Sequence, residues 1–431
     1  MTITPYEQMS TEDLRALEAR LQQEYQAFKA KGLKLNMARG KPSDAQLALS
    51  LPLLEEVNSH SDLIASDGTN CANYGGLAGI PEARKLMGDV LGVPADNVIM
   101  GGSASLALMY DAIDRAYTHG VLGSTPWCKL DEVKWICPVP GYDRHFAITE
   151  HFGFTMINVP LTGHGPDMDQ VEELVKDPAV KGIWCVPKYS NPTGETYSDE
   201  TVRRMASLKP AAKDFRIFWD NAYAVHHLYE DEKDQDQLLE ILSACEEAGN
   251  PDLVYEFAST SKVTFPGAGI SCMAASRANV DDALAQMGVR LISNDKINQL
   301  RHARFLSSAV GVANHMKKHA ALLRPKFKLV DEVLTRELEG TGIATWTKPR
   351  GGYFVSFSAL PGCAKAIVDK TKEAGLTLTG AGAPFPYHKD PEDSVIRIAP
   401  SLPPIDELSE CMDLFALCVR LVSAGRILSL R

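Results

Sequence analysis

Lys262 and Asp220 are the residues whose types and positions point most directly to chemistry. Lys262 ends a Ser-Thr-Ser-Lys sequence that follows the apolar, strand-like segment 253–258, and Asp220 closes the apolar segment 215–219. A lysine just after a buried strand loses its proton more easily than a free lysine, because desolvation disfavours the ammonium form. The neutral amine is a nucleophile that forms a Schiff base with an aldehyde. Together the two residues match what pyridoxal phosphate requires, a lysine for its aldehyde and a carboxylate for its ring nitrogen.

Both residues also have an ordinary structural interpretation. Lys262 could be a surface lysine after a strand, and Asp220 could be a solvated turn aspartate that caps the next helix. The other predicted loops bear on this choice, since ligands of open α/β sheets bind outside the carboxyl ends of the strands. The polar residues that follow each predicted strand are therefore considered together.

Three of these loops carry residues that suit a phosphorylated heterocycle. Small residues at 101–105 could bring backbone N–H groups onto a phosphate at a helix N-terminus, or could form a tight turn and no more. Tyr142 follows the second strand and could stack on a flat ring or lie in the core. Asn191 lies in an Asn-Pro-Thr-Gly turn after the fourth strand and could donate a hydrogen bond to an oxygen of the ring.

The elements that must position these residues follow from the hydrophobic pattern. Apolar residues at three- and four-residue steps predict a helix over 10–32. Between about 95 and 275, short apolar runs alternate with amphipathic segments, which predicts about seven strands with mostly helical crossovers. These runs lie at 98–100, 135–137, 156–159, 182–186, 217–219, 253–255 and 270–273.

The C-terminal part of the chain has a different pattern. A long amphipathic stretch without strong strand signals runs from about 279 to 339, and strands are then predicted at 351–357 and 395–399, with a helix-like stretch between them. A final helix starts at about Ile405. We therefore expect a large α/β domain with a mainly parallel sheet over 50–315. A smaller α+β domain would be formed by 1–49 and 316–431.

The composition of the 431-residue chain is that of an ordinary globular protein, with 45% hydrophobic and 23% charged residues. The net charge of -11 argues against a nucleic-acid partner. The nine cysteines form no Cys-x-x-Cys pair, so we expect neither disulfides nor a metal site. There is no signal peptide and no run of about 20 apolar residues, which predicts a cytoplasmic protein without a membrane partner.

A set of short motifs between about residues 36 and 400 resembles the fold-type I, class I/II pyridoxal-phosphate aminotransferases, and the motifs follow the order of that family. They are Asn73-Tyr74-Gly75-Gly76 with Gly79, Gly101-Gly102-Ser103-Ala104, Tyr142, Asn191-Pro192-Thr193-Gly194, Asp220-x-x-Tyr223, Ser259-x-Ser261-Lys262, Gly351-Gly352-Tyr353-Phe354 and Arg397-Ile398. Together these motifs make a strong match. The resemblance implies a seven-stranded, mainly parallel sheet in the large domain and pyridoxal 5'-phosphate as the cofactor.

The resemblance also implies a role for each site residue. Lys262 would hold the cofactor and shuttle the proton between substrate and cofactor, and Asp220 would pair with the ring nitrogen. Asn191 and Tyr223 would hydrogen-bond the phenolic oxygen, while Tyr142 would stack on the ring. The phosphate would be surrounded by Gly102, Ser103, Ala104, Ser259 and Ser261.

Two further implications concern the substrate and the assembly. Arg397 matches the arginine that holds the substrate α-carboxylate, a bidentate pairing that suits a guanidinium. Tyr74 looks like the tyrosine that reaches the phosphate of the neighbouring subunit, which implies a homodimer with shared active sites. Asn191, Arg39 and Gly40 are further candidates for substrate binding, and Arg39 is our first choice for a second substrate carboxylate. The other candidate cations are Lys41, Arg144, Lys296, Arg301 and Arg304.

One position departs from the family pattern. Many relatives carry an arginine eight residues after the lysine, where it neutralises the phosphate, and this chain has Ile270 there. Either N–H and hydroxyl donors hold the phosphate, or another cation takes that role. Segments 38–43, 260–269 and 298–302 look like a divergent bacterial branch that is similar to aspartate aminotransferases.

We therefore expect a transaminase that moves an amino group between aspartate or glutamate and a 2-oxo acid such as 2-oxoglutarate, by a ping-pong mechanism. Alternatives on the same fold are a pyridoxal-phosphate-dependent lyase and an aminotransferase for alanine or aromatic amino acids. A regulatory protein of this fold is a further alternative. It would need an N-terminal DNA-binding domain, and only about 35 residues precede Asn36.

Overall fold

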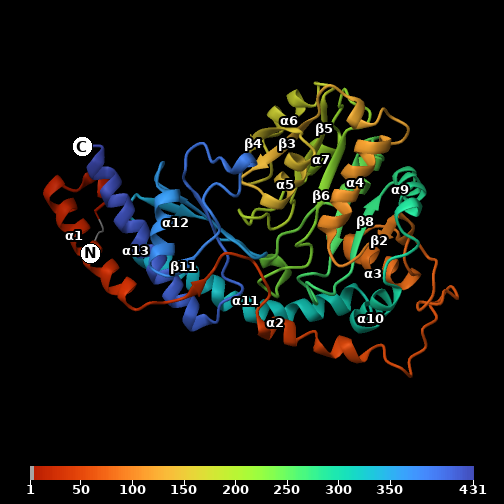
Figure 1. Ribbon diagram of the computed structural model, residues 1–431, viewed down its shortest axis with the longest axis horizontal. Coiled ribbons are helices and arrows are strands. Elements are labelled where there is room, and N and C mark those ends of the chain that lie inside the picture. Colours follow the sequence, from red (N-terminus) through yellow and green to blue (C-terminus); the bar gives the residue numbers. More distant parts are fainter. Residues whose placement is uncertain (1–3) are drawn as a thin grey trace.

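The computed structural model describes residues 4–431 of the chain. Its centre is a seven-stranded sheet with the strand order β2-β8-β7-β6-β5-β3-β4 (Figure 1). Strand β8 is antiparallel to its neighbours β2 and β7, and the other strand pairs are parallel. The predicted seven-stranded, mainly parallel sheet is confirmed. Its strands are β2 (Val98–Met100), β3 (Lys134–Val139), β4 (Thr155–Pro160), β5 (Val180–Cys185), β6 (Arg216–Asp220), β7 (Val254–Ser259) and β8 (Ser271–Ala275).

Helices cover both faces of this sheet, so its central strands are buried along their whole length. Every residue of β5 and β6 is buried, which explains their nearly continuous apolar sequence. One face packs against α4 (Ser105–His119), α5 (Asp143–His151) and α9 (Arg277–Arg290). The other face packs against α6 (Met168–Leu174), α7 (Asp199–Ala206) and α8 (Ile241–Glu247). At the β2 edge lie α3 (Pro81–Leu91) and α10 (Lys296–Leu306).

The N- and C-terminal segments build a second apolar core (Figure 1). It contains a three-stranded antiparallel sheet and a two-stranded parallel one. The larger sheet consists of β9 (Ala344–Trp346), β10 (Val355–Ala359) and β12 (Val395–Ile398), and the smaller of β1 (Leu35–Asn36) and β11 (Leu376–Thr377). The helices around them are α1 (Thr11–Ala30), α2 (Asp44–Ala48), α12 (Ala364–Glu373) and α13 (Ile405–Ser429).

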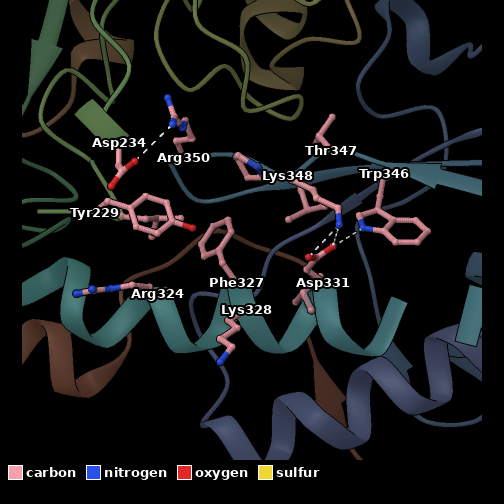
Figure 2. Close-up of a pocket in the computed structure, with 14 residues that line it drawn as sticks. Tyr229, Asp234, Arg324, Phe327, Lys328, Asp331, Trp346, Thr347, Lys348 and Arg350 are labelled. Atoms are coloured by element: carbon pink, nitrogen blue, oxygen red, sulfur yellow. Dashed lines mark hydrogen bonds and ion pairs between the residues drawn. The ribbon is translucent and has the colours of Figure 1, made fainter. Parts of the chain in front are cut away.

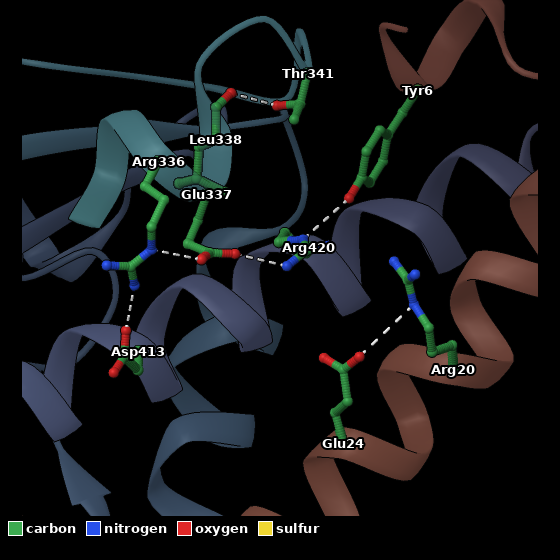
Figure 3. Close-up of polar contacts among 9 residues, drawn as sticks. All are labelled: Tyr6, Arg20, Glu24, Arg336, Glu337, Leu338, Thr341, Asp413 and Arg420. Atoms are coloured by element: carbon green, nitrogen blue, oxygen red, sulfur yellow. Dashed lines mark hydrogen bonds and ion pairs between the residues drawn. The ribbon is translucent and has the colours of Figure 1, made fainter. Parts of the chain in front are cut away.

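Polar contacts join the helices of this second core. Figure 3 shows Arg420 of α13, which pairs with Glu337 at 2.7 Å and donates to the Tyr6 hydroxyl at 3.4 Å. Arg336 bridges Glu337 and Asp413 at 2.9 and 2.6 Å. These pairs therefore link the last turns of the long helix α11 (Ala309–Leu338) to α13 and to the N-terminal segment.

That long helix, α11 (Ala309–Leu338), connects the two cores. Its first half packs against α2, α3 and α10, and its second half packs against α13. The predicted domain boundary between residues 315 and 316 falls inside this continuous helix. The division into 50–315 and 1–49 with 316–431 stays a prediction.

Some local expectations differ from the structure. The strand predicted from Gly351 begins only at Val355, because Gly352 has φ +78° and turns the backbone against Tyr189. Strands β1, β9 and β11 were not predicted, since none of them is a fully buried apolar run as the equally short β2 is. The predicted helix at 10–32 is α1, with the Ser10 hydroxyl accepting the Asp13 N–H as its cap.

In residues 4–431 no helix combines the length and the apolar character needed to cross a membrane. The same residues contain no cluster of three or more acidic, histidine or cysteine side chains that could hold a metal ion. All nine cysteines are free thiols, and Cys128 is the exposed one.

Candidate active site

Asp220 and Lys262 lie at the carboxyl ends of neighbouring parallel strands. Asp220 is the last residue of β6 and lies opposite Phe257 of β7, and Lys262 follows in the loop after β7. Asp220 is only 3% exposed. It is therefore not a solvated turn aspartate, and it lies at the sheet edge where α/β proteins bind ligands.

His145 holds one oxygen of this buried carboxylate. Its Nε2 lies 2.9 Å from Asp220 Oδ2, and its ring stacks on Trp184 with centroids 4.5 Å apart. The other oxygen, Oδ1, is buried and has no hydrogen-bond partner in the described chain. Leaving a buried acceptor without a donor is costly, so Oδ1 is suited to receive an N–H from a ligand.

Sequence reasoning missed His145. It lies in the first turn of α5, three residues after Tyr142. Residues three apart on a helix are neighbours, and the two rings indeed meet with centroids 4.9 Å apart. The spacing from the tyrosine is the signal that could have identified this histidine.

Lys262 is half-buried, and burial lowers the pKa of its ammonium group. The nearby Asp220 carboxylate raises this pKa, and the Arg397 guanidinium lowers it further. Its Nζ lies 4.8 Å from the centre of the Tyr223 ring. A lysine with a lowered pKa has a larger share of neutral amine at a given pH, which is the nucleophilic form.

Two tyrosines of the site keep their protons at neutral pH. Tyr142 is half-buried, and burial, followed by the Asp220 and Asp143 charges, raises its pKa to about 12. Tyr223 is 2% exposed, and burial raises its pKa still more strongly. Each phenol can therefore donate a hydrogen bond to a ligand oxygen.

Arg397, on β12, brings the C-terminal part of the chain to the same place. Its Nη1 donates to Asn191 Oδ1 at 3.2 Å and pairs with Asp143 Oδ1 at 3.1 Å. Its Nη2 donates to the Thr379 hydroxyl at 3.2 Å, and the guanidinium lies 4.9 Å from the Phe354 ring centre. The buried Nε has no partner among the described residues. The guanidinium is thus held in place and keeps an unused donor.

The loops after β2 and β7 meet through hydroxyl groups. Ser261 Oγ donates to the Ser103 carbonyl at 2.7 Å, and Ser271 Oγ donates to the Gly102 carbonyl at 2.9 Å. Ser259 Oγ accepts the Ser261 N–H at 3.4 Å. A Cβ on Gly102 would meet nothing within 4 Å. The two loops are therefore held together beside open space.

Positions 104 and 270 affect which donors and charges these two loops offer to a ligand. Ala104 precedes α4 and offers no side-chain cap, so the first N–H groups of that helix are not satisfied by it. Ile270 is 1% exposed and lies in an apolar cluster, with its N–H donating to Thr260 Oγ1 at 2.9 Å. Position 270 therefore contributes no charge here.

These residues fit the predicted cofactor. The amine of Lys262 suits an aldehyde, and the unpartnered Oδ1 of Asp220 suits a ring N–H. The protonated phenols suit a ring oxygen, and the open Gly102 loop at the start of α4 suits a phosphate.

Other predicted site residues lie outside this buried set. Tyr74 is 81% exposed and so does not join it within its own chain. Arg39 is also exposed, but the neighbouring Gly40 is close to the site, since a Cβ there would lie 2.5 Å from Cζ of Phe354. Gly40 therefore lies beside Phe354, whose ring contacts the Arg397 guanidinium.

Three of the remaining candidate cations are hydrogen-bonded within the chain. Lys296 donates to the Asn73 carbonyl at 2.7 Å, Arg301 to Asn298 at 2.7 Å and Arg304 to the Asp62 carbonyl at 2.6 Å. These three are already used within the chain. Lys41 and Arg144 are exposed.

A cavity of about 560 Å³ lies between α11 and the segment 346–350 (Figure 2). Its charged side chains are paired with one another or with near neighbours: Lys348 with Asp331 at 2.9 Å, and Arg350 with Asp234 at 3.7 Å. None of the predicted site residues lines it.

Comparisons with known proteins identify the family of this chain. A family model described as aspartate amino-transferase matches residues 9–430. An aspartate aminotransferase of Corynebacterium glutamicum is 48% identical over 405 residues, which are 94% of this chain and 93% of that protein. The crystal structure of an aspartate transaminase from the same species has a TM-score of 0.96 at 46% identity, covering 99% of this chain and 100% of that chain.

A more distant structure shares the fold alone. It is an α-aminoadipate aminotransferase of Thermus thermophilus, complexed with N-(5'-phosphopyridoxyl)-L-leucine. The TM-score is 0.73 at 19% identity, and the match covers 98% of this chain and 96% of that chain.

Proposed function

This chain belongs to the aspartate amino-transferase family, and we propose that it transfers the amino group of aspartate or glutamate to a 2-oxo acid with pyridoxal 5'-phosphate held at Lys262. One observation carries the proposal. The Lys262 amine, with its lowered pKa, lies near a buried carboxylate whose Oδ1 has no partner. An acid in that state suits a protonated ring nitrogen.

Each residue then has a defined task. When bound, the cofactor supplies an electron sink conjugated to the carbon that loses its proton. Lys262 would bind its aldehyde and, as a free neutral amine, would carry the proton. Asp220, held by His145, would keep the ring nitrogen protonated. Tyr223 and Asn191 would contact the ring oxygen, and Tyr142 would cover the ring.

The phosphate is proposed to bind without the usual arginine. Backbone N–H groups at the start of α4 would supply donors, because Ile270 supplies no side-chain donor, and the serine hydroxyls of the two loops would join them by turning from their present acceptors. The residues are Gly102, Ser103, Ala104, Ser259 and Ser261.

The substrate is proposed to bind between Arg397 and Lys262. The α-carboxylate pairs with Arg397, whose buried Nε is unused, and a second carboxylate reaches the exposed Arg39 beside Gly40. The dicarboxylic preference is supported by the names of the Corynebacterium relatives, which are aspartate aminotransferases. We propose 2-oxoglutarate as the acceptor and a ping-pong order.

The test of the lysine is spectroscopic. Loaded with pyridoxal phosphate, the wild-type protein should show the visible absorbance of a lysine-bound cofactor, and Lys262→Ala should lack it. Lys188→Ala is a matched control, because burial also lowers the pKa of Lys188, to about 8, while its amine donates to the Ala224 carbonyl. A band that persists in Lys262→Ala would refute the assignment.

The test of the reaction is a panel of amino acids added without an oxo acid. Aspartate or glutamate should remove the visible band about tenfold faster than alanine or phenylalanine, because only they engage a second cation. Equal or faster reaction with alanine or an aromatic amino acid would contradict the substrate assignment. Release of pyruvate and ammonia would favour the lyase alternative.

A homodimer with shared sites is the proposed assembly. Tyr74 is too exposed to serve its own site, and Lys296 of α10 holds the neighbouring Asn73 carbonyl. Apolar side chains are exposed on the nearby segments, at Leu51, Leu54, Ile64, Ile292 and Ile297. The cytoplasmic location and the absence of a nucleic-acid partner stay predictions of the sequence.

A further inference from the structure

A short segment crosses the active site from the substrate side to the lysine side. It consists of residues 38–50, which we call the strap, and contains the Arg39–Gly40 turn and helix α2. At its first end, the Thr379 hydroxyl donates to the Ala38 carbonyl. Since Thr379 also accepts a hydrogen bond from Arg397, this end of the strap is tied to the candidate substrate arginine.

At the other end, Gln46 is fully buried and uses its whole amide group. Its Oε1 accepts the Ser43 N–H at 3.1 Å. Its Nε2 donates to the Tyr353 hydroxyl at 2.9 Å and lies 3.2 Å from His319 Nδ1. Since Nε2 carries only hydrogens, His319 accepts at Nδ1. The amide has no spare donor for any other group.

The residues that contact the Gln46 amide lead to the backbone of the loop that carries Lys262. The Tyr353 hydroxyl lies 3.5 Å from the Lys262 carbonyl. His319 Nε2, which carries the hydrogen because Nδ1 accepts, lies 3.2 Å from His315 Nε2. His315 Nε2 donates to the Val263 carbonyl at 2.9 Å, so the two imidazoles touch without a hydrogen bond between them. Ser50 of the strap itself also donates to the Val263 carbonyl, at 3.4 Å. The carbonyl groups of Lys262 and Val263 are thus contacted by side chains that belong to the strap or are held by it.

The network is neutral and closed to solvent. Burial lowers the pKa of His319 to about 4, and it also lowers the pKa of His315, so both imidazoles are neutral near pH 7. Helix α2 has five residues, too few to be stable in isolation. The position of the strap therefore depends on its side-chain contacts, which include those of the fully buried Gln46 and Ser50.

We propose that Gln46 is a positioning residue, which fixes the Arg39–Gly40 turn at a set distance from the Lys262 amine. The inference rests on the proposed aminotransferase site. A substrate held by Arg397 has to fit between that turn and the amine. Loss of the Gln46 contacts should therefore weaken substrate binding more than it slows proton transfer.

Gln46→Glu tests this inference, because it keeps the shape and the acceptor for the Ser43 N–H but removes at least one of the two donors. We expect the KM for aspartate to rise about tenfold, while kcat stays within about threefold of wild type. In the same holoenzyme, hydrogen exchange of the backbone amides should accelerate in residues 38–50 and 262–265. The exchange measurement does not depend on turnover.

Asn279→Asp is the matched control. Asn279 is 1% exposed and donates to the Asp252 carbonyl near the start of β7, at the opposite end of the strands from Lys262. It should leave KM and the exchange of both segments unchanged. If Gln46→Glu does not fold, Tyr353→Phe removes one acceptor at nearly constant volume and should accelerate exchange at 262–265.

Two results would overturn the inference. One is unchanged exchange in residues 38–50 of Gln46→Glu, and the other is an equal effect of Asn279→Asp. A wild-type protein that reacts with no amino acid would refute the proposed function instead, and the exchange data distinguish the two failures.

Discussion

Arg397 already has an anionic partner before any substrate binds. The Asp143 carboxylate lies 3.1 Å from its Nη1, on a side chain that is 26% exposed. A substrate α-carboxylate is also an anion that requires this guanidinium. The aspartate therefore competes with the substrate as well as orienting the arginine.

Replacing Asp143 with Asn should lower the KM for both the amino acid and the oxo acid, by about two- to fivefold, since a partly exposed ion pair is weak. The amide can still accept from Nη1, so kcat should change little. Steady-state kinetics at low and high salt measure this, and the salt dependence of KM should also be smaller in the variant. A higher KM in Asp143→Asn would show that the aspartate mainly orients the arginine.

Glu256 is a buried acid outside the reacting groups. It is 2% exposed, it accepts from Asn221 Nδ2 at 2.9 Å, and its Oε2 has no partner among the described residues. Burial, with a smaller contribution from Glu240, raises its pKa to about 8. The folded protein therefore keeps this proton over a range in which the unfolded chain loses it.

The free energy of unfolding should consequently fall as the pH rises from about 4.5 to about 8, because the unfolded state binds fewer protons there. The expected contribution is on the order of a few kcal/mol across this range. In Glu256→Gln the fall should be smaller, since an amide does not titrate. Denaturant unfolding at several pH values measures both slopes, and identical slopes would refute the assignment.

Sequence placed Lys262 and Asp220 at the carboxyl ends of neighbouring strands, where the structure has them, because one follows an apolar run and the other closes one. Their roles in the chemistry stay predictions. His145, Asp143 and Thr379 were missed, because each acts through a partner distant in sequence, such as Asp220 for His145 and Arg397 for the other two. No local pattern encodes such a pairing.

At the scale of elements, the loop before β10 shows how closely the two cores are packed. A Cβ on Gly351 would lie 2.3 Å from the Tyr189 ring and 2.5 Å from the His226 carbonyl. A bridge pairs Gly351 with His227 across the same junction. Only a residue without a side chain fits there.

Gly351→Ala should therefore destabilise the protein by about 2 kcal/mol, as overpacking in a tight core does. Gly267→Ala is the control, because a Cβ there would meet nothing within 4 Å. Calorimetric melting of both variants provides the comparison. Equal melting temperatures would mean that the loop before β10 relaxes freely.

The long strands and helices were predictable from sequence because burial imposes a period on them. The apolar residues 183–185 at the end of β5 and the spaced leucines of α1 are examples. Strand β1, with two residues, forms only because Leu35 meets Leu376 from a distant part of the chain. Its existence follows from the tertiary fold rather than from its own residues.

At the scale of the whole molecule, the exposed Tyr74 leads to a prediction about subunits. A dimer formed from one Tyr74→Ala chain and one Lys262→Ala chain would hold one site with both residues intact. Mixing and refolding the two variants should therefore restore about a quarter of wild-type activity, as expected for random pairing in a two-fold dimer. Each variant refolded alone is the control. No recovery, or a monomer by light scattering, would contradict shared sites.

The stacking of Trp184 on His145 allows binding at the site to be followed by fluorescence. The two rings are nearly parallel, and the imidazole also contacts Asp220. A change in charge or occupancy at that carboxylate is thus transmitted directly to an indole, whose emission is sensitive to its surroundings. The protein carries an intrinsic fluorophore at the floor of its own site, and a light signal can report filling of that site without any added label.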